Sequence, residues 1–231
     1  MKALLVVLAL VLGLLVLVDR VAVGYAEGQV ATQLAEKGDL QGTPEVDIAG
    51  FPFLTQAVGG RYDDVRISLT AAELGQPEGT RADVTLRGVE VPLSSVVSGS
   101  VEEVPVESVD GTATLSYALL SEQLGGDTTL RREGDGLRIT KTVDVVGQTL
   151  PLTAVGTVTL EGNELVVDVE EASGAGVEVP DFLVNRVADS LDLRYAVPAL
   201  PFGLQLTDVT PAEDGVDIRV QATDTVLRAV E

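Results

Sequence analysis

The chain opens with sixteen consecutive residues that have no polar side chain, Ala3 to Val18. Lys2 stands before this run and Asp19-Arg20 after it, as in a secretory h-region or a short membrane anchor. Apolar residues then resume as far as Gly24, so the whole stretch is about 22 residues long and can cross a bilayer with the charged pair at the outer interface. Residues 1–24 are therefore predicted to form an uncleaved signal anchor.

A cleaved signal peptide is the alternative, because the small residues Ala22, Gly24 and Ala26 also suit a signal peptidase. Both alternatives place residues 25–231 on the extracytoplasmic, periplasmic side of the plasma membrane. Beyond Arg20 the chain holds 35 acidic and 13 basic residues, so the positive-inside rule keeps the N-terminus in the cytoplasm. We expect a cell-envelope protein, anchored, or secreted if the segment is cleaved.

Helices are predicted where apolar residues follow a helical period and end at glycine, or begin after proline. The predicted helices are residues 19–37, 50–59, 117–124 and 181–189. Strands are predicted where apolar and polar residues alternate. The predicted strands are residues 45–48, 65–69, 84–86, 137–145, 158–160, 165–169 and 216–220.

A hairpin is the clearest local prediction, because Gly162-Asn163 supplies a two-residue turn between two alternating segments. A long meander with few helices buries its apolar face by curling around them. The fold class expected is therefore α+β, with a long curved, mainly antiparallel sheet wrapping a few short helices. No internal boundary is evident, so residues 25–231 are predicted to be one extracytoplasmic domain.

The amino-acid composition excludes several classes of partner, catalytic site and metal site. The chain has 36 acidic and 15 basic residues, a formal charge of −21, and no basic run, which argues against nucleic acid as a partner. It has no His and no Cys, which excludes Ser-His-Asp and Cys-His catalysis, zinc sites of those ligands and disulfides. Aromatic residues make up 3% of the chain, with no Trp, so stacking platforms for sugars are scarce.

The remaining acidic and glycine-rich motifs are better explained by structure than by chemistry. Gly174-Ala175-Gly176 lacks the third glycine and the helix of a dinucleotide-binding loop. The acids from Asp208 to Asp217 lack the spacing of a calcium loop, and adjacent acids such as Glu102-Glu103 point to opposite faces of a strand. We expect no enzyme, no catalytic residue, no metal and no cofactor.

The four phenylalanines all lie beside or near prolines at the starts of elements: Phe51, Phe53, Phe182 and Phe202. Aromatic side chains in such places often close the ends of a core. Alternatively, they line the mouth of an apolar cavity or dip into a membrane surface. Small and branched residues dominate the predicted inner faces, which leaves room for a ligand.

A family resemblance is carried by motifs spread along the chain. They are Asp19-Arg20, Gly50-Phe51-Pro52-Phe53-Leu54-Thr55-Gln56, Gly60-Arg61-Tyr62-Asp63-Asp64-Val65, Leu86-Arg87-Gly88-Val89, Gly111 to Tyr117, Val197 to Val209 and Asp214-Gly215-Val216. In this order they resemble the LmeA-like phospholipid-binding family of actinobacterial cell envelopes, over about residues 19 to 228. The resemblance implies a fold like the tubular lipid-binding folds, with an apolar cavity. It also implies binding of phospholipids such as phosphatidylinositol or phosphatidylglycerol, for transfer or presentation, in support of lipoglycan or envelope biogenesis.

The strongly acidic domain requires lipid to be held by apolar contacts, with arginines selecting the headgroup. The residues hypothesised to contact acyl chains are Phe51, Phe53, Leu54, Phe182, Leu183, Val187, Phe202 and Leu204. Arg61 and Arg186 are the headgroup candidates. A monomer is expected, with the membrane contacted through the N-terminal segment. An extracytoplasmic scaffold without lipid and a carboxylate-based hydrolase are the alternatives.

Overall fold

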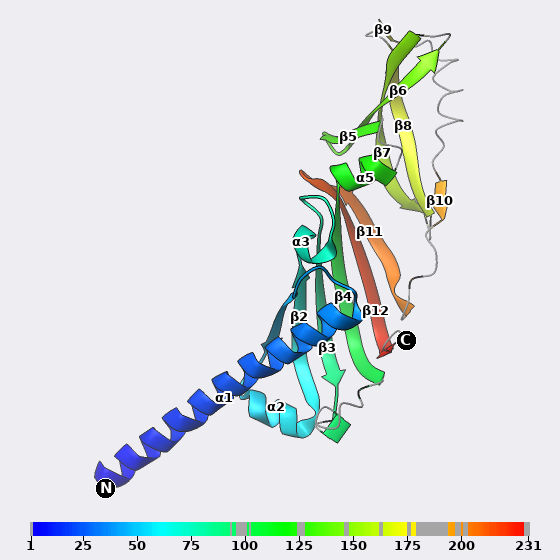
Figure 1. Ribbon diagram of the computed structural model, residues 1–231. Helices are drawn as coiled ribbons and strands as arrows, with labels where there is room; N and C mark the ends of the chain where they lie inside the picture. The colour runs from blue at the N-terminus through cyan, green and yellow to red at the C-terminus, as the bar shows by residue number, and fades with distance from the viewer. Residues whose placement is uncertain are drawn as a thin grey trace. The chain divides into compact units, whose positions relative to one another are not determined.

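Figure 1 shows the computed structural model of the protein. The structure describes residues 2–92, 94–95, 101, 103–123, 128–145, 148–161, 164–174, 177–178, 194–196, 200 and 203–228. The fold is α+β, as predicted, with long antiparallel pairings, a few helices and an apolar helix at the N-terminus. Within the described residues the sheets are open and do not close into a barrel.

Among the described residues the helices are few, and one of them is much longer than the rest. They are α1 (Lys2–Lys37), α2 (Phe53–Gly59), α3 (Ala71–Leu74) and α5 (Tyr117–Gln123). The helices predicted at 19–37, 50–59 and 117–124 are thus confirmed, and the first is continuous with the apolar run. Gly38 ends α1 as expected, its N–H donating to the Leu34 carbonyl at 2.9 Å. The helix predicted at 181–189 lies outside the described residues.

The strands form two sheets. The first sheet has the order β1-β2-β3-β4-β12-β11, and the second has the order β10-β8-β7-β6-β5 with β9 paired to β8. Their bounds are β1 (Glu45–Ala49), β2 (Arg61–Leu69), β3 (Arg81–Glu90), β4 (Glu103–Ser116), β5 (Thr128–Glu133), β6 (Gly136–Val145), β7 (Gln148–Glu161), β8 (Glu164–Gly174), β9 (Val177–Glu178), β10 (Arg194–Ala196), β11 (Gln205–Pro211) and β12 (Gly215–Arg228).

Every strand predicted from alternation lies within a strand of the structure. The predicted hairpin is also confirmed, because β7 and β8 pair antiparallel with Glu161 opposite Glu164. Its two turn residues lie outside the described residues. The sequence analysis missed β4, β5 and β11 and the short strands β9 and β10. In β4 the buried positions Val106, Val109, Gly111, Thr114 and Ser116 do not keep a two-residue period, so alternation could not reveal it.

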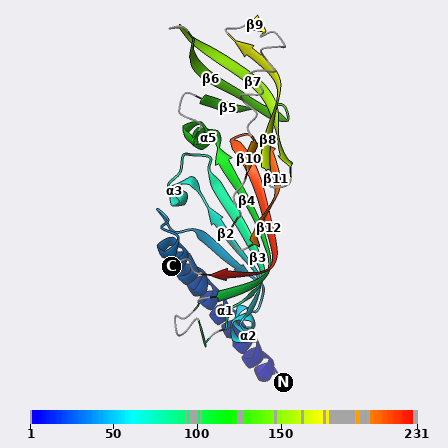
Figure 2. The ribbon, with the colours of Figure 1, turned by 90° about the vertical axis from the view of Figure 1, so that its right-hand side faces the viewer.

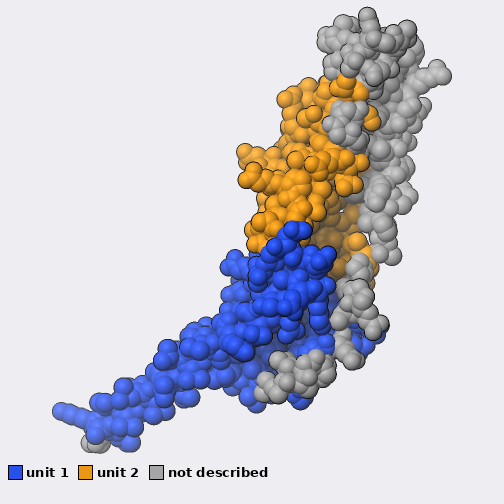
Figure 3. All heavy atoms as spheres, viewed as in Figure 1, with its two compact units in different colours: residues 1–69, 83–110, 222–231 blue, residues 70–82, 111–221 orange. Residues whose placement is uncertain are grey.

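The chain forms two compact units, coloured separately in Figure 3. Unit 1 comprises residues 1–69, 83–110 and 222–231, and unit 2 comprises residues 70–82 and 111–221. The chain therefore passes between the units at the end of β2 and again within β3, β4 and β12. Neither unit is a continuous segment of sequence, so neither can be excised as a fragment.

Each unit has its own buried apolar side chains. In unit 1 these are Val23 and Ala31 of α1, Val46, Ile48, Phe53, Ala57, Val65, Leu86, Val89, Val106, Val109 and Ala222. In unit 2 a cluster joins Leu130 and Leu137 of the hairpin β5–β6 to Leu206, Val209 and Val216 of β11 and β12. We call these five residues the unit 2 cluster. Half-buried apolar side chains border it, including Leu120, Ile139, Leu160 and Ile218.

Candidate functional site

The motif from Gly50 to Gln56 folds into the corner between α1 and α2, in unit 1. Pro52 is the N-cap of α2 and provides no side-chain hydrogen bond to the helix. Asp19 of α1 supplies the missing acceptor, since one carboxylate oxygen accepts the Leu54 N–H at 2.9 Å. Its other oxygen accepts a hydrogen bond from Arg20 at 2.8 Å. Asp19 is only 2% exposed, so α1 and α2 are joined through a buried carboxylate.

The two phenylalanines of the motif point to different surroundings. Phe53 is 5% exposed and packs in the core of unit 1, with its ring centroid 6.1 Å from that of Tyr62. Burial raises the pKa of the Tyr62 hydroxyl, so this group stays neutral beside the core. Phe51 is 64% exposed, with the Arg20 guanidinium 5.4 Å from its ring centroid. Leu54 is half-buried between these extremes.

Gln56 holds the loop that carries Phe51. Its side-chain amide donates to the Ala49 carbonyl at 3.1 Å and accepts the Asp63 N–H at 2.9 Å. Gly50 has a φ of 103°, and a Cβ there would collide with the Gln56 amide. The Gln56 side chain can therefore hold the loop only where residue 50 has no Cβ. This explains why glycine and glutamine flank the aromatic residues.

The C-terminal half of α1 packs against the strands of unit 1. Val23 and Ala31 are buried, and the Glu27 carboxylate accepts the Ile48 N–H of β1 at 2.9 Å. The apolar residues of α1 from Leu4 to Val18 are largely exposed. Figures 1 and 2 both show this end of α1 extending beyond the strands of unit 1. Helix α1 is long and apolar enough to cross a membrane.

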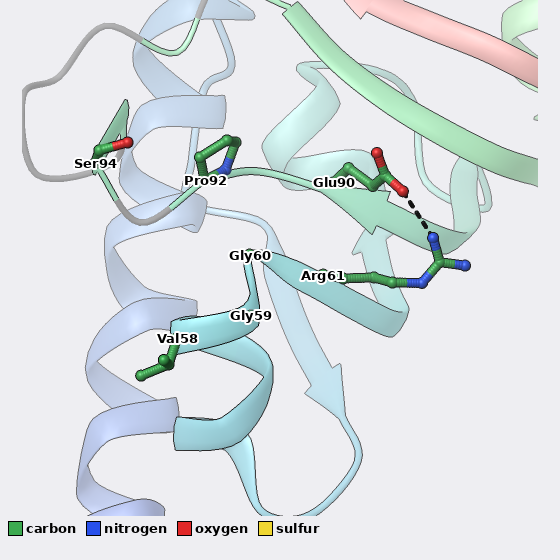
Figure 4. A pocket seen from close by; sticks show the side chains of 7 residues that line it. All are labelled: Val58, Gly59, Gly60, Arg61, Glu90, Pro92 and Ser94. Atoms are coloured by element: carbon green, nitrogen blue, oxygen red, sulfur yellow. Dashed lines mark hydrogen bonds and ion pairs between the residues drawn. The ribbon is translucent and has the colours of Figure 1, made fainter.

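A surface hollow of about 520 Å³ opens beside α2, as Figure 4 shows. It is lined by Val58, Gly59, Gly60, Arg61, Glu90, Pro92 and Ser94. Arg61 forms ion pairs with Glu90 at 2.7 Å and with Glu107 at 2.6 Å. The hydrogen bond that Arg61 donates to the Glu107 carboxylate is the main reason why the pKa of the guanidinium is raised. A lipid phosphate at Arg61 would have to compete with two carboxylates for one cation.

A second hollow, of about 230 Å³, lies on the hairpin β5–β6 of unit 2 and is lined by Thr129, Arg131, Arg138 and Thr140. Arg131 and Arg138 stand opposite each other in the register, and Arg138 pairs with Glu133 at 2.7 Å. Alternate residues of a strand point to opposite faces, so this hollow lies across the sheet from Leu130 and Leu137. Neither hollow is an enclosed apolar cavity, and within the described residues the predicted cavity stays a prediction.

The structure brings together four of the ten predicted site residues, Phe51, Phe53, Leu54 and Arg61, in unit 1. Leu204 is half-buried in unit 2, one residue before β11. Phe182, Leu183, Arg186, Val187 and Phe202 lie outside the described residues. The sequence analysis missed Asp19, Glu27 and Gln56 as parts of the site. The signals that pointed to Asp19 were its place as the first charge after the apolar run and the Asp19-Arg20 motif of the family resemblance, and neither indicated a contact with α2.

These features define an α+β domain that begins with a helix long and apolar enough to span a membrane. The chain belongs to the LmeA-like phospholipid-binding family, whose model matches residues 17–221. No curated protein and no solved structure matches the chain. The family is one of lipid-binding proteins, consistent with a protein that is not an enzyme. Among the described residues no group of acids could hold a metal ion.

Proposed function

We propose that the protein is a phospholipid-binding protein of the cell envelope, tethered to the outer face of the plasma membrane by an uncleaved α1. The observation that carries the proposal is the family match over residues 17–221, which starts inside α1 and includes all of unit 2 and most of unit 1. The protein works as a monomer that transfers or presents lipid, in support of envelope or lipoglycan biogenesis. Phosphatidylinositol and phosphatidylglycerol are the proposed lipid classes.

Packing of α1 supports an anchor that is retained. Cleavage after Ala22, Gly24 or Ala26 would remove Asp19 from α2, and with it the acceptor of the Leu54 N–H. A partly buried amide that loses its hydrogen-bond acceptor is costly, so a cleaved chain would lose stability in unit 1. The intact mass of protein extracted from membranes tests this directly. Retention of α1 predicts the full 24.1 kDa, and a mass lacking the first 22 to 26 residues would contradict it.

Apolar contact is the proposed means of holding lipid. Beyond residue 26 the chain carries a formal charge of −22, which repels anionic membranes rather than attracting them. Each buried acyl methylene contributes about 0.8 kcal/mol, so half of one acyl chain outweighs modest headgroup repulsion. The half-buried apolar residues that pack around the unit 2 cluster are the surface proposed to contact acyl chains. Leu204 precedes Leu206 of that cluster by two residues and is a proposed contact.

Of the two arginines proposed to contact the lipid headgroup, only Arg61 lies among the described residues. Arg61 is held by two carboxylates, so its removal should change headgroup preference only slightly. Arg186 lies outside the described residues and remains the other proposed headgroup contact. We expect Arg186→Gln to alter the preference between anionic and zwitterionic lipids more than Arg61→Gln does.

Native mass spectrometry of the full chain in detergent micelles tests the proposal. The expected result is one phospholipid per chain that survives exchange into delipidating detergent. Leu204→Asp should lose this lipid, whereas Thr207→Asp, at an exposed position of β11, should keep it. A wild-type chain that carries no retained lipid, and takes up neither anionic nor zwitterionic phospholipid, would overturn the proposal. The scaffold without lipid would then be the better account.

A further inference from the structure

An apolar ring stands exposed where α1 enters the domain. Phe51 is 64% exposed, and the Arg20 guanidinium lies 5.4 Å from its ring centroid. Three residues further along, the Leu54 N–H donates to the Asp19 carboxylate. These two contacts hold Phe51 at the level of residues 19 and 20 along the axis of α1. This level is only one to two residues beyond the last residue of the apolar run, Val18.

The length of the apolar run sets the depth of that level in a membrane. Sixteen helical residues are about 24 Å long. The hydrocarbon core of a bilayer is about 30 Å thick, so the run is about 6 Å, or four residues, too short. With Lys2 at the inner boundary, the hydrocarbon reaches past Val18 to about residue 22. The level of Phe51 therefore falls within the outermost part of the outer leaflet.

The two charged residues of α1 at this level, Asp19 and Arg20, are arranged so that the Asp19 carboxylate is not exposed to lipid. Asp19 is 2% exposed and is paired with both Arg20 and the Leu54 N–H. Arg20 has a half-exposed side chain, long enough to reach lipid phosphates while covering the Phe51 ring. Val21 and Tyr25 are 66% and 71% exposed on the same helix. Aromatic residues favour this zone of a membrane.

We infer that Phe51 inserts into the outer leaflet beside α1, so that the loop between β1 and α2 is a second membrane contact of the domain. The inference rests on the proposed anchor. Insertion is apolar, which is the form of membrane contact open to a domain of charge −22. Because Asp19 ties this loop to α1, the helix and the ring together fix how unit 1 stands on the bilayer.

The chain has no Trp, so one introduced Trp reports its own position alone. We would reconstitute the full-length variants Phe51→Trp, Val21→Trp and Tyr25→Trp separately into phosphatidylcholine–phosphatidylglycerol vesicles. Lipids brominated on the acyl chain quench Trp in the hydrocarbon, and iodide quenches Trp in water. Val21→Trp and Tyr25→Trp serve as a depth scale on α1. Phe51→Trp is expected to lose as much fluorescence to bromine as Val21→Trp, and more than Tyr25→Trp.

Two other outcomes would overturn the inference, and they differ in what they say about the anchor. If Phe51→Trp is quenched by iodide alone while Val21→Trp is quenched by bromine, the anchor stands and the insertion of residue 51 fails. If neither is quenched by bromine, the proposed membrane span fails as well. The chain also has no Cys, so Phe51→Cys with a nitroxide label provides a second probe. Its collisions with oxygen should exceed those with a water-soluble nickel complex.

Discussion

At the scale of single residues, the site depends on one buried carboxylate. Pro52 leaves α2 without a capping side chain, and Asp19 provides the acceptor from 35 residues earlier in the chain. The ion pair with Arg20 compensates the charge of the buried group. The sequence indicated the aromatic motif and the charged pair as separate signals. Their connection could not be predicted, because it arises only from the tertiary packing of α1 against α2.

Substitution of Asp19 tests this connection. Asp19→Leu should lower the thermal unfolding midpoint, because the partly buried Leu54 N–H loses its hydrogen-bond acceptor. Asp19→Asn should lower it less, because the amide oxygen can still accept that hydrogen bond. Asp47→Asn, at an exposed position of β1, is the matched control and should leave the midpoint unchanged. Circular dichroism of the full chain in micelles measures all three. Equal midpoints for Asp19→Leu and the control would show that the hydrogen bond from the Leu54 N–H to Asp19 does not contribute to stability.

A second residue-scale prediction concerns a close approach of two strands. Gly215 begins β12, and a Cβ there would overlap the carbonyl oxygen of Leu115 in β4. Gly215→Ala should therefore destabilise the protein by about 1–3 kcal/mol. Gly28 lies inside α1 with nothing near its would-be Cβ, so Gly28→Ala should stabilise by about 0.5–1 kcal/mol. Thermal unfolding of both variants would reveal opposite shifts, and a stable Gly215→Ala protein would contradict the close approach of β12 to Leu115 in β4.

At the scale of elements, α5 is fastened to the turn between β11 and β12. The Tyr117 hydroxyl donates to the Ala212 carbonyl at 2.8 Å, and the Tyr117 N–H donates to the Asp214 carbonyl at 3.2 Å. Burial raises the pKa of Tyr117, so the hydroxyl remains a donor at neutral pH. The turn thus packs against α5, beside the unit 2 cluster.

Removing this hydroxyl should loosen the turn. Tyr117→Phe is expected to cost about 1 kcal/mol, the value of one hydrogen bond to a partly buried carbonyl. Hydrogen exchange at residues 212–216 should increase in the same variant. Tyr25→Phe is the control, because Tyr25 is exposed on α1 and its change should alter neither quantity. Unchanged exchange in Tyr117→Phe would indicate that the turn is held by other contacts.

Helices and strands were predicted correctly from the sequence where a single local pattern, such as alternation or a terminal glycine, was clear. The alternating strands and the helices that end at glycine were predicted correctly, because residues close by in the sequence are enough to specify such elements. Strand β4 escaped prediction because its buried positions shift phase along its length. The outward Phe51 and the inward Phe53 were also indistinguishable in the sequence. Both follow the same pattern of aromatic residues around a proline, and only tertiary packing, such as that of Phe53 against Tyr62, separates them.

At the scale of the whole molecule, a highly acidic protein has to associate with lipid. The chain carries −21 overall, and its apolar residues are distributed between a long apolar N-terminal helix and the buried side chains of two compact units. The account assigns membrane contact to α1 and Phe51, and acyl-chain binding to the surface around the unit 2 cluster. Family membership supports lipid binding in general, and both the binding of phospholipid and its site require measurement.

The most direct measurement is photo-cross-linking in the membrane. A phospholipid with a diazirine at the end of one acyl chain would be mixed into vesicles with the full chain and irradiated, and adducts mapped by peptide mass spectrometry. The account predicts adducts on α1 and, in addition, on peptides that contain Leu130, Leu137 or Leu206. Adducts confined to α1 and the Phe51 loop would show that the protein only sits in the bilayer. That result would contradict the claim that its domain holds phospholipid.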